Sequence, residues 1–166
     1  MRLRTEGERF AFDDAVLGRV EGHVDDVVLA RADGVPAYNL AVVVDDEVQA
    51  IDQVVRGDDL ASSTPRQLLL QELLGFRRPR YQHVPLVLGP TGKRLAKRDG
   101  AVTLAELAAE GWTTGDVLAV LARSVGLASV TEPTSTITAD LLVGRYDPGA
   151  LPPQPSTYAE LCALRD

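Results

Sequence analysis

The sequence predicts an α/β fold in which parallel strands joined by a crossover helix are followed by a small helical region. Residues 51–55 and 81–88 each have the length and the valine, isoleucine or tyrosine content of a strand, and the segment between them presents a leucine-rich face at helical spacing. A strand, a helix and a strand in this order favour a right-handed parallel crossover, which is half of a doubly wound sheet. Beyond residue 100 the pattern becomes that of short helices.

The N-terminal part is predicted to contain short strands. Residues 7–24 alternate weakly between apolar and polar side chains, which favours a hairpin. The run 26–31 indicates a strand that closes at the turn 32–36, where Gly34 can supply a positive φ. Residues 38–44 are ambiguous, because their valines favour a strand while the apolar positions also fall at helical spacing. Propensity alone favours a strand there.

The crossover helix has both start and stop signals. Residues 62–64 offer three hydroxyl side chains that can cap it, Pro65 suits its first turn, and Gly75 can end it. After the second strand, the glycine turn 89–92 leads into the basic loop 93–98.

The helical region is expected to hold helices over 104–109 and 114–125, the second capped at 113 or 114 and stopped by Gly126. We expect Trp112 to pack between them. The Thr/Pro/Gly-rich stretch 131–155 predicts an extended segment with one short helix near 139–143. A last short helix is expected within 156–165.

Composition excludes several classes of protein. Two His and the single Cys162 cannot build a tetrahedral zinc site of about four ligands, and one Cys cannot form an internal disulfide. The N-terminus lacks the apolar core of a secretion signal, and no apolar run approaches the roughly 18 residues of a membrane span. We therefore expect a soluble, cytoplasmic chain with no zinc, no other metal site and no membrane partner.

The net charge of −7 argues against a protein that coats nucleic acid nonspecifically, because phosphate binding requires cations. The charge is unevenly distributed, however. The segment 66–98 carries a net charge of +7, which leaves −14 for the remainder. This segment is either a solvated face with scattered cations or a local phosphate-handling site.

Four features suggest chemistry, and each has an ordinary explanation. Tyr38 could be a core aromatic residue. Arg56 could form a structural ion pair with Asp58 or Asp59, although the carboxyl ends of parallel strands are also where α/β sheets bind ligands. The glycine turn 89–92 matches neither the P-loop nor the dinucleotide fingerprint. The pairs Asp45–Asp46 and Asp58–Asp59 could suggest a divalent cation site, but such pairs at loop edges mostly mark helix ends and turns.

Three ordered blocks resemble bacterial glutamyl-tRNA synthetases. Residues 31–46 are similar to the family segment R-x-D-G-x-x-x-Y-x-x-A-x-V-V-D-D, and residues 54–60 with 63–67 are similar to the block that follows it. Residues 94–101 stand where the family has its K-M-S-K-S loop. The resemblance covers about residues 5–150 and implies the second half of a class I, Rossmann-like catalytic domain. It also implies that the valine-rich ambiguous segment is a helix.

The resemblance implies roles for individual residues. Tyr38 and Arg56 match residues that contact bound glutamate, where a guanidinium can hold a carboxylate in bidentate fashion and a phenol can orient it. Lys97 matches a lysine that stabilises the phosphates of ATP, supplied as the Mg²⁺ complex, while glutamate attacks the α-phosphorus. The ATP-binding signature loop comprises Arg94, Leu95, Ala96, Lys97 and Arg98. Arg94 keeps the charge of the lysine it replaces, whereas Ala96 loses a serine hydroxyl.

The C-terminal part resembles the queuosine-specific branch of the family. Residues 102–166 are too few for a large anticodon-binding region, and the Pro-rich stretch 145–152 is similar to that compact branch. The resemblance implies ATP, L-glutamate and tRNA(Asp) as substrates, with glutamate transferred to the queuosine base. The alternatives are a piece of a general glutamyl-tRNA synthetase and a non-catalytic tRNA-binding remnant.

Residues 1–30 resemble only the tail of the segment that connects the two halves of the catalytic domain. They contain nothing similar to the family's His-Ile-Gly-His loop, its first-half glutamate pocket or the zinc site that some members carry there. The expected division is therefore a connecting tail (1–30), a catalytic half (31–100), a helical stem-contact region (101–155) and a C-terminal helix or tail (156–166). We expect this chain to be inactive alone because the N-terminal half is missing, and a separately encoded N-terminal half is one candidate partner. We also expect the isolated chain to be partly unstable or to self-associate, because it exposes an apolar edge strand and an uncovered helix-packing surface.

Overall fold

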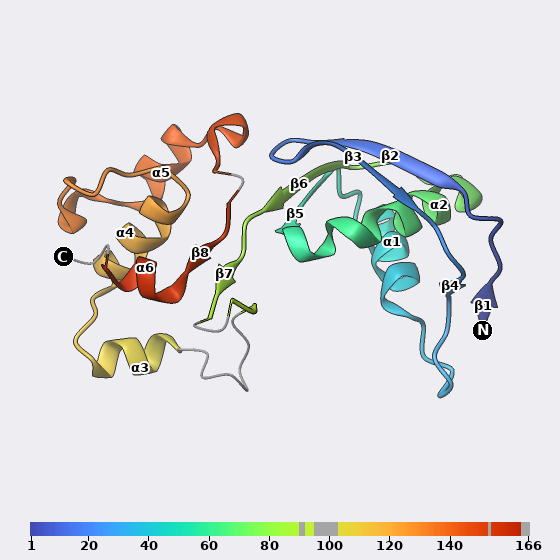
Figure 1. The fold of residues 1–166 in the computed structure, drawn as a ribbon, viewed down its shortest axis with the longest axis horizontal. Helices are drawn as coiled ribbons and strands as arrows, with labels where there is room; N and C mark the ends of the chain where they lie inside the picture. Colours follow the sequence, from blue (N-terminus) through green and yellow to red (C-terminus); the bar gives the residue numbers. More distant parts are fainter. Residues whose placement is uncertain (90–91, 95–102, 153, 164–166) are drawn as a thin grey trace. The chain divides into compact units, whose positions relative to one another are not determined.

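The chain forms two compact units, Met1–Val84 and Pro85–Asp166, in a computed structural model (Figure 1). The structure describes residues 1–89, 92–94, 103–152 and 154–163. In chain order the first unit contains β1 (Arg2–Leu3), β2 (Arg9–Asp14), β3 (Gly18–His23), β4 (Val27–Val28), α1 (Tyr38–Val48), β5 (Gln53–Gly57), the 3₁₀ helix η1 (Asp58–Ser63), α2 (Thr64–Leu74) and β6 (Arg80–Val84).

Four strands of the first unit form a mixed sheet in the order β3-β2-β6-β5. Strands β2 and β3 make the predicted antiparallel hairpin. Strands β5 and β6 pair in parallel with Arg56 opposite His83, so the expected parallel pair on either side of a helix is confirmed. The parallel contact between β2 and β6 consists of one pair, Asp14 and Tyr81. Strand β5 is an edge strand and exposes Val55, which is the apolar edge we expected. Self-association stays a prediction.

Helix α1 resolves the ambiguous valine-rich segment. The strand that propensity favoured is wrong, and the helix implied by the family resemblance is confirmed. Val43 is only 2% exposed and packs in one cluster with Val24 and Val27 from the β3–β4 region and with Leu69 and Leu70 of α2. Burying an apolar side chain stabilises by about 1.5–3 kcal/mol, which outweighs the several tenths of a kcal/mol that valine loses in helix propensity.

Helix α2 ends as predicted but begins differently. Gly75 follows its last residue with φ 70°, a left-handed conformation that glycine adopts at little cost. Ser63 occupies the capping position, yet its hydroxyl donates to the carbonyl of Leu60 at 2.7 Å instead of capping the helix. Leu68 packs against Phe12 of β2 and Tyr81 of β6, which fixes α2 on the sheet.

Two predicted strands are shorter than expected. The run 26–31 contains only β4, followed by a bridge between Ala30 and Pro36 around the predicted turn. The run 81–88 divides into β6 and a separate two-residue strand, because Pro85 has no N–H with which to continue a ladder.

The second unit contains β7 (Val87–Leu88), α3 (Leu104–Ala109), α4 (Thr114–Ser124), the 3₁₀ helix η3 (Thr134–Thr136), α5 (Ala139–Arg145), the 3₁₀ helix η4 (Pro148–Ala150), β8 (Ser156–Thr157) and α6 (Tyr158–Ala163). The predicted helices α3 to α5 are confirmed. Thr113 caps α4 in a reciprocal box with Asp116, and Gly126 lies beyond its end with φ 73°. The last predicted helix is confirmed as α6. The first two residues of the predicted range 156–165 instead form β8, which pairs in parallel with β7.

The boundary between the two compact units falls between Val84 and Pro85 in the sequence. The functional division expected from the family, at residues 30, 100 and 155, stays a prediction, and residues 100 and 101 lie outside the described residues. Within the described part of the chain, every helix is too short or too polar to cross a lipid bilayer.

Candidate functional site

The candidate site is centred on Arg56, a half-buried residue one position before the carboxyl end of β5. Its Nε donates a hydrogen bond to Nε2 of His83 on the neighbouring strand at 3.1 Å. Its Nη2 donates to Thr64 Oγ1 and Gln67 Oε1, both at 2.8 Å. The guanidinium also lies over the ring of Tyr81, 5.6 Å from its centroid. The sequence offered Asp58 and Asp59 as ion-pair partners of Arg56. In the structure its three hydrogen-bond acceptors are instead the uncharged side chains of His83, Thr64 and Gln67.

The hydrogen bonds of Arg56 determine which of its donors remain. A guanidinium has five N–H groups, and the three bonds use the one on Nε and both on Nη2. Among the described residues, Nη1 has no hydrogen-bond partner. A carboxylate would therefore be met by Nη1, and the two-nitrogen fork that we expected would require Nη2 to release Thr64 or Gln67.

His83 is held from its other side by Asp14. The Nδ1 of His83 lies 2.6 Å from Oδ2 of Asp14, and both side chains are fully buried. The Asp14 carboxylate also accepts hydrogen bonds from the backbone N–H of His83, Val16 and Leu17. Burial by itself would raise the pKa of Asp14, but the hydrogen bonds from Leu17, Val16 and His83 outweigh it and hold that pKa below its ordinary value.

A second branch of the network leads from Arg56 to helix α1. Gln67 Nε2 donates to Asn39 Oδ1 at 3.0 Å, which links α2 to the second residue of α1. On the same helix, burial raises the pKa of Asp46, the Arg56 guanidinium opposes that rise, and the neighbouring Asp45 adds to it. The first turn of α1 is thereby tied to the arginine through neutral amides.

Tyr38 is the first residue of α1 and is 54% exposed. Its interpretation as a core aromatic residue is therefore wrong. Tyr38 precedes Asn39, the residue through which α1 joins the Arg56 network, and its role in a shared site with Arg56 stays a prediction. A phenol presented to solvent at this position is available for a ligand.

Most of the predicted signature loop lies outside the described residues. Leu95, Ala96, Lys97 and Arg98 belong to that part, so their roles stay predictions. Arg94 is described and forms a bridge with Leu88. The predicted glycine turn is confirmed at its two ends, since Gly92 has φ 71° and donates to the carbonyl of Gly89 at 3.0 Å.

The basic segment 66–98 is partly neutralised. Three of its arginines form ion pairs with exposed acids, namely Arg66 with Asp25, Arg78 with Glu72 and Arg80 with Asp52. These pairs favour a solvated face for the part 66–80, whereas a phosphate-handling role for the basic loop 93–98 stays a prediction.

Sequence reasoning missed the polar residues that surround Arg56. His83 lies in a run that the sequence predicts only as a strand, and Gln67 lies on the leucine-rich helix α2. Both are at most 2% exposed. Polar residues at buried positions of apolar elements were the available signal, because such groups must have hydrogen-bond partners.

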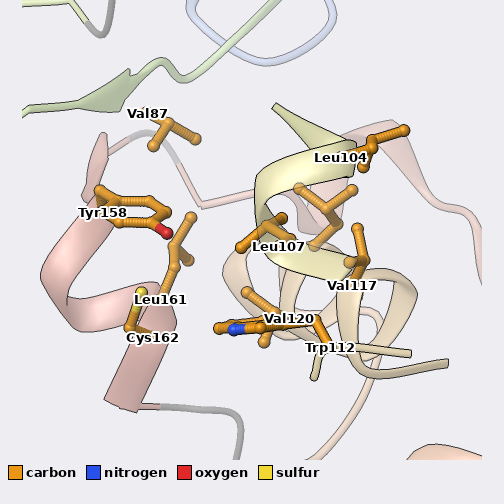
Figure 2. A pocket seen from close by; sticks show the side chains of 10 residues that line it. Val87, Leu104, Leu107, Trp112, Val117, Val120, Tyr158, Leu161 and Cys162 are labelled. Carbon is orange, nitrogen blue, oxygen red and sulfur yellow. The ribbon is translucent and has the colours of Figure 1, made fainter. Parts of the chain in front are cut away.

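The second unit contains an apolar pocket of about 220 Å³ between α3, α4 and α6 (Figure 2). It is lined by Val87, Leu104, Leu107, Trp112, Val117, Val120, Leu121, Tyr158, Leu161 and Cys162. Its main polar groups are the Tyr158 hydroxyl and the Cys162 thiol, and burial and the bond to Cys162 raise the pKa of Tyr158 to about 12. The pocket lacks the converging polar groups of a reaction site. In the described residues, no group of three or more His, Cys, Asp or Glu side chains is placed to hold a metal ion.

Comparison with known proteins agrees with the predicted family. The family described as tRNA synthetases class I (E and Q), catalytic domain, matches residues 1–136. This chain belongs to that family. It is 55% identical over 155 residues to the Glutamyl-Q tRNA(Asp) synthetase of Nocardia farcinica, a match that covers 93% of this chain and 48% of that protein. It is 46% identical over 134 residues to a glutamate–tRNA ligase of Nitratidesulfovibrio vulgaris, covering 70% of this chain and 29% of that protein.

The fold of this family member is also found in a solved structure. A glutamate tRNA ligase from Elizabethkingia meningosepticum, determined in complex with its amino acid, aligns with a TM-score of 0.76 over 96% of this chain and 36% of that one. At 24% identity this likeness shows the fold of the class I catalytic domain. The chain spans about half the length of its Nocardia relative.

Proposed function

We propose that this chain contributes to a cytoplasmic enzyme that activates L-glutamate with ATP and transfers it to the queuosine base of tRNA(Asp). The observation that carries the proposal is the Arg56 guanidinium near the carboxyl end of β5, which keeps the two N–H groups of Nη1 unengaged among the described residues. The 55% identity of this chain to a Glutamyl-Q tRNA(Asp) synthetase supports the queuosine-specific branch over a general glutamyl-tRNA synthetase.

In this proposal, Arg56 holds one carboxylate of glutamate through Nη1, and the exposed Tyr38 hydroxyl donates a second hydrogen bond. A carboxylate oxygen of glutamate attacks the α-phosphorus of the ATP–Mg²⁺ complex, and the bond from that phosphorus to pyrophosphate breaks. Lys97 stabilises the charge that develops on the phosphates and forms no covalent bond. A nucleophile on the queuosine base then takes the glutamyl group, and AMP leaves.

Glutamate-dependent exchange of labelled pyrophosphate into ATP tests this proposal. Because the chain spans about half of its Nocardia relative, exchange is measured for the chain alone and for the chain mixed with the N-terminal half of that relative. We expect exchange in the mixture, its loss on Lys97→Ala, and no loss on Arg19→Ala, which removes an exposed cation paired with Asp13. A mixture that fails to exchange, while the full-length relative exchanges under the same conditions, would overturn the proposal.

A tRNA-binding role without catalysis is the second candidate, and the +7 segment favours it. The ion pairs formed by three of its arginines reduce the number of free cations. Salt-dependent binding of tRNA(Asp), together with no exchange in either sample, would support this second role.

A further inference from the structure

The buried contacts behind Arg56 determine the direction of each hydrogen bond in a chain of three residues. Arg56 can only donate, so Nε2 of His83, 3.1 Å from Nε of Arg56, must accept. The single proton of a neutral imidazole then lies on Nδ1, which faces the Asp14 carboxylate at 2.6 Å. Each of the two hydrogen bonds that join Arg56 to His83 and His83 to Asp14 therefore pairs one donor with one acceptor.

We propose that His83 and Asp14 are positioning residues for Arg56: Asp14 fixes the His83 ring with its proton on Nδ1, so that the Nε2 lone pair holds the Arg56 guanidinium ready for a carboxylate. The inference deepens the proposed function and rests on it, because it assigns the groups that prepare the proposed glutamate contact. Thr64 and Gln67 complete the arrangement by holding Nη2.

The arrangement holds the guanidinium without a hydrogen bond to a carboxylate. An arginine side chain has about 2 kcal/mol of rotamer entropy to lose, and acceptors supplied by β6 and α2 remove that freedom before a ligand arrives. All three acceptors are uncharged. A carboxylate in the place of His83 would also hold the guanidinium, but it would compete with the ligand carboxylate for the positive charge. The Asp14 charge is instead kept one imidazole ring away from Arg56.

A purely structural role is the competing explanation, because the contact between Asp14 and His83 also joins β2 to β6. Two substitutions of His83 separate the roles. Asn places an amide N–H where Nδ1 donates to Asp14 and leaves Arg56 Nε without its acceptor. Gln can place a carbonyl oxygen where Nε2 accepts from Arg56 and loses the donor to Asp14. A positioning role makes His83→Asn the more damaging change at Arg56, whereas a structural role makes His83→Gln the more damaging one.

Nuclear magnetic resonance of the full ¹⁵N-labelled chain tests the inference directly. In the wild-type chain we expect scalar coupling across the hydrogen bond between Arg56 Nε and His83 Nε2, and an imidazole with its proton on Nδ1. We expect water exchange of the Arg56 Nε–H to accelerate about tenfold in His83→Asn and to stay within about threefold of wild type in His83→Gln. His23→Asn is the control, because it changes the exposed second histidine. Absence of the coupling, or equal acceleration in both His83 variants, would overturn the inference.

Titration with L-glutamate distinguishes this inference from the proposed function. We expect the Arg56 side-chain resonances to shift with glutamate, and the affinity to fall about tenfold in His83→Asn but much less in His83→Gln. A wild-type chain that shows the coupling but no shift, alone or mixed with the N-terminal half of the Nocardia relative, counts against the proposed function. If the wild-type chain shows the coupling but His83→Asn and His83→Gln lose the same glutamate affinity, that result counts against His83 as a positioning residue for Arg56.

Discussion

The Nδ1 atom of His83 lies 2.6 Å from Oδ2 of Asp14, and neither side chain has any exposed surface. The two residues belong to β6 and β2, strands whose backbone pairing is limited to Asp14 and Tyr81. The side-chain bond therefore reinforces the sheet where its backbone ladder is shortest. It also lies directly behind the arginine of the candidate site.

Replacing Asp14 with Asn should destabilise the first unit. The Asp14 oxygens accept from four donors, and an amide NH₂ in either orientation faces at least one of those donors without an acceptor. We expect the free energy of unfolding to fall by about 2–4 kcal/mol, measured by urea denaturation. Asp13→Asn is the matched control on the same strand, where an exposed ion pair with Arg19 contributes about 0–1 kcal/mol. Equal losses in the two variants would contradict the prediction.

The same carboxylate should make stability depend on pH in a defined direction. Because the pKa of Asp14 is lowered in the folded chain from 3.8, the unfolded chain binds the proton first as the pH falls. The contribution of Asp14 is therefore complete above its unfolded value and is lost as the pH falls through the lower folded value. Denaturation curves recorded between about pH 6 and pH 3 should show a smaller acid loss for Asp14→Asn than for wild type. If the stability of wild type and of Asp14→Asn falls equally with pH, groups other than Asp14 dominate the acid loss of stability.

Replacing Tyr38 with Phe should separate stability from binding. The Tyr38 hydroxyl has no hydrogen-bond partner among the described residues, and the side chain is 54% exposed. We expect the free energy of unfolding to change by less than about 0.5 kcal/mol. Glutamate affinity should fall roughly tenfold if the phenol orients the ligand. Thermal melts and glutamate titration measure the two effects, and an unchanged affinity would remove Tyr38 from the site.

Two Gly→Ala substitutions should act in opposite directions. A Cβ on Gly22 of β3 would lie 2.8 Å from Cγ of Pro65, whose ring cannot move far at the start of α2. We expect Gly22→Ala to lower the free energy of unfolding by about 1–3 kcal/mol. Gly144, within α5, has open space where the Cβ of an alanine would lie, so Gly144→Ala should stabilise by about 0.5–1 kcal/mol. Urea denaturation measures both, and a neutral Gly22→Ala would show that α2 can shift on the sheet.

Local signals predicted much of the fold. Gly75 ends α2, Gly34 occupies the predicted turn, and Thr113 caps α4, each because the backbone conformation or the hydroxyl acts within a few residues of its own position. Propensity failed at α1, where valines favour a strand. The resemblance to glutamyl-tRNA synthetases corrected that error, because it carries information about packing that a single segment does not contain.

The sequence by itself determined the family, the parallel pair around a crossover helix, and the candidate ligand residues Tyr38, Arg56 and Lys97. The tertiary structure decided which groups surround Arg56. His83, Thr64 and Gln67 come from two elements, and Asp14 is separated from His83 by 69 residues. Local patterns do not report such contacts, because the register of β5 against β6 and the packing of α2 on the sheet bring these side chains together. Buried acceptors on β6 and α2 engage Nε and Nη2 of Arg56, and within the described part of the chain Nη1 is left as the open donor of this arginine.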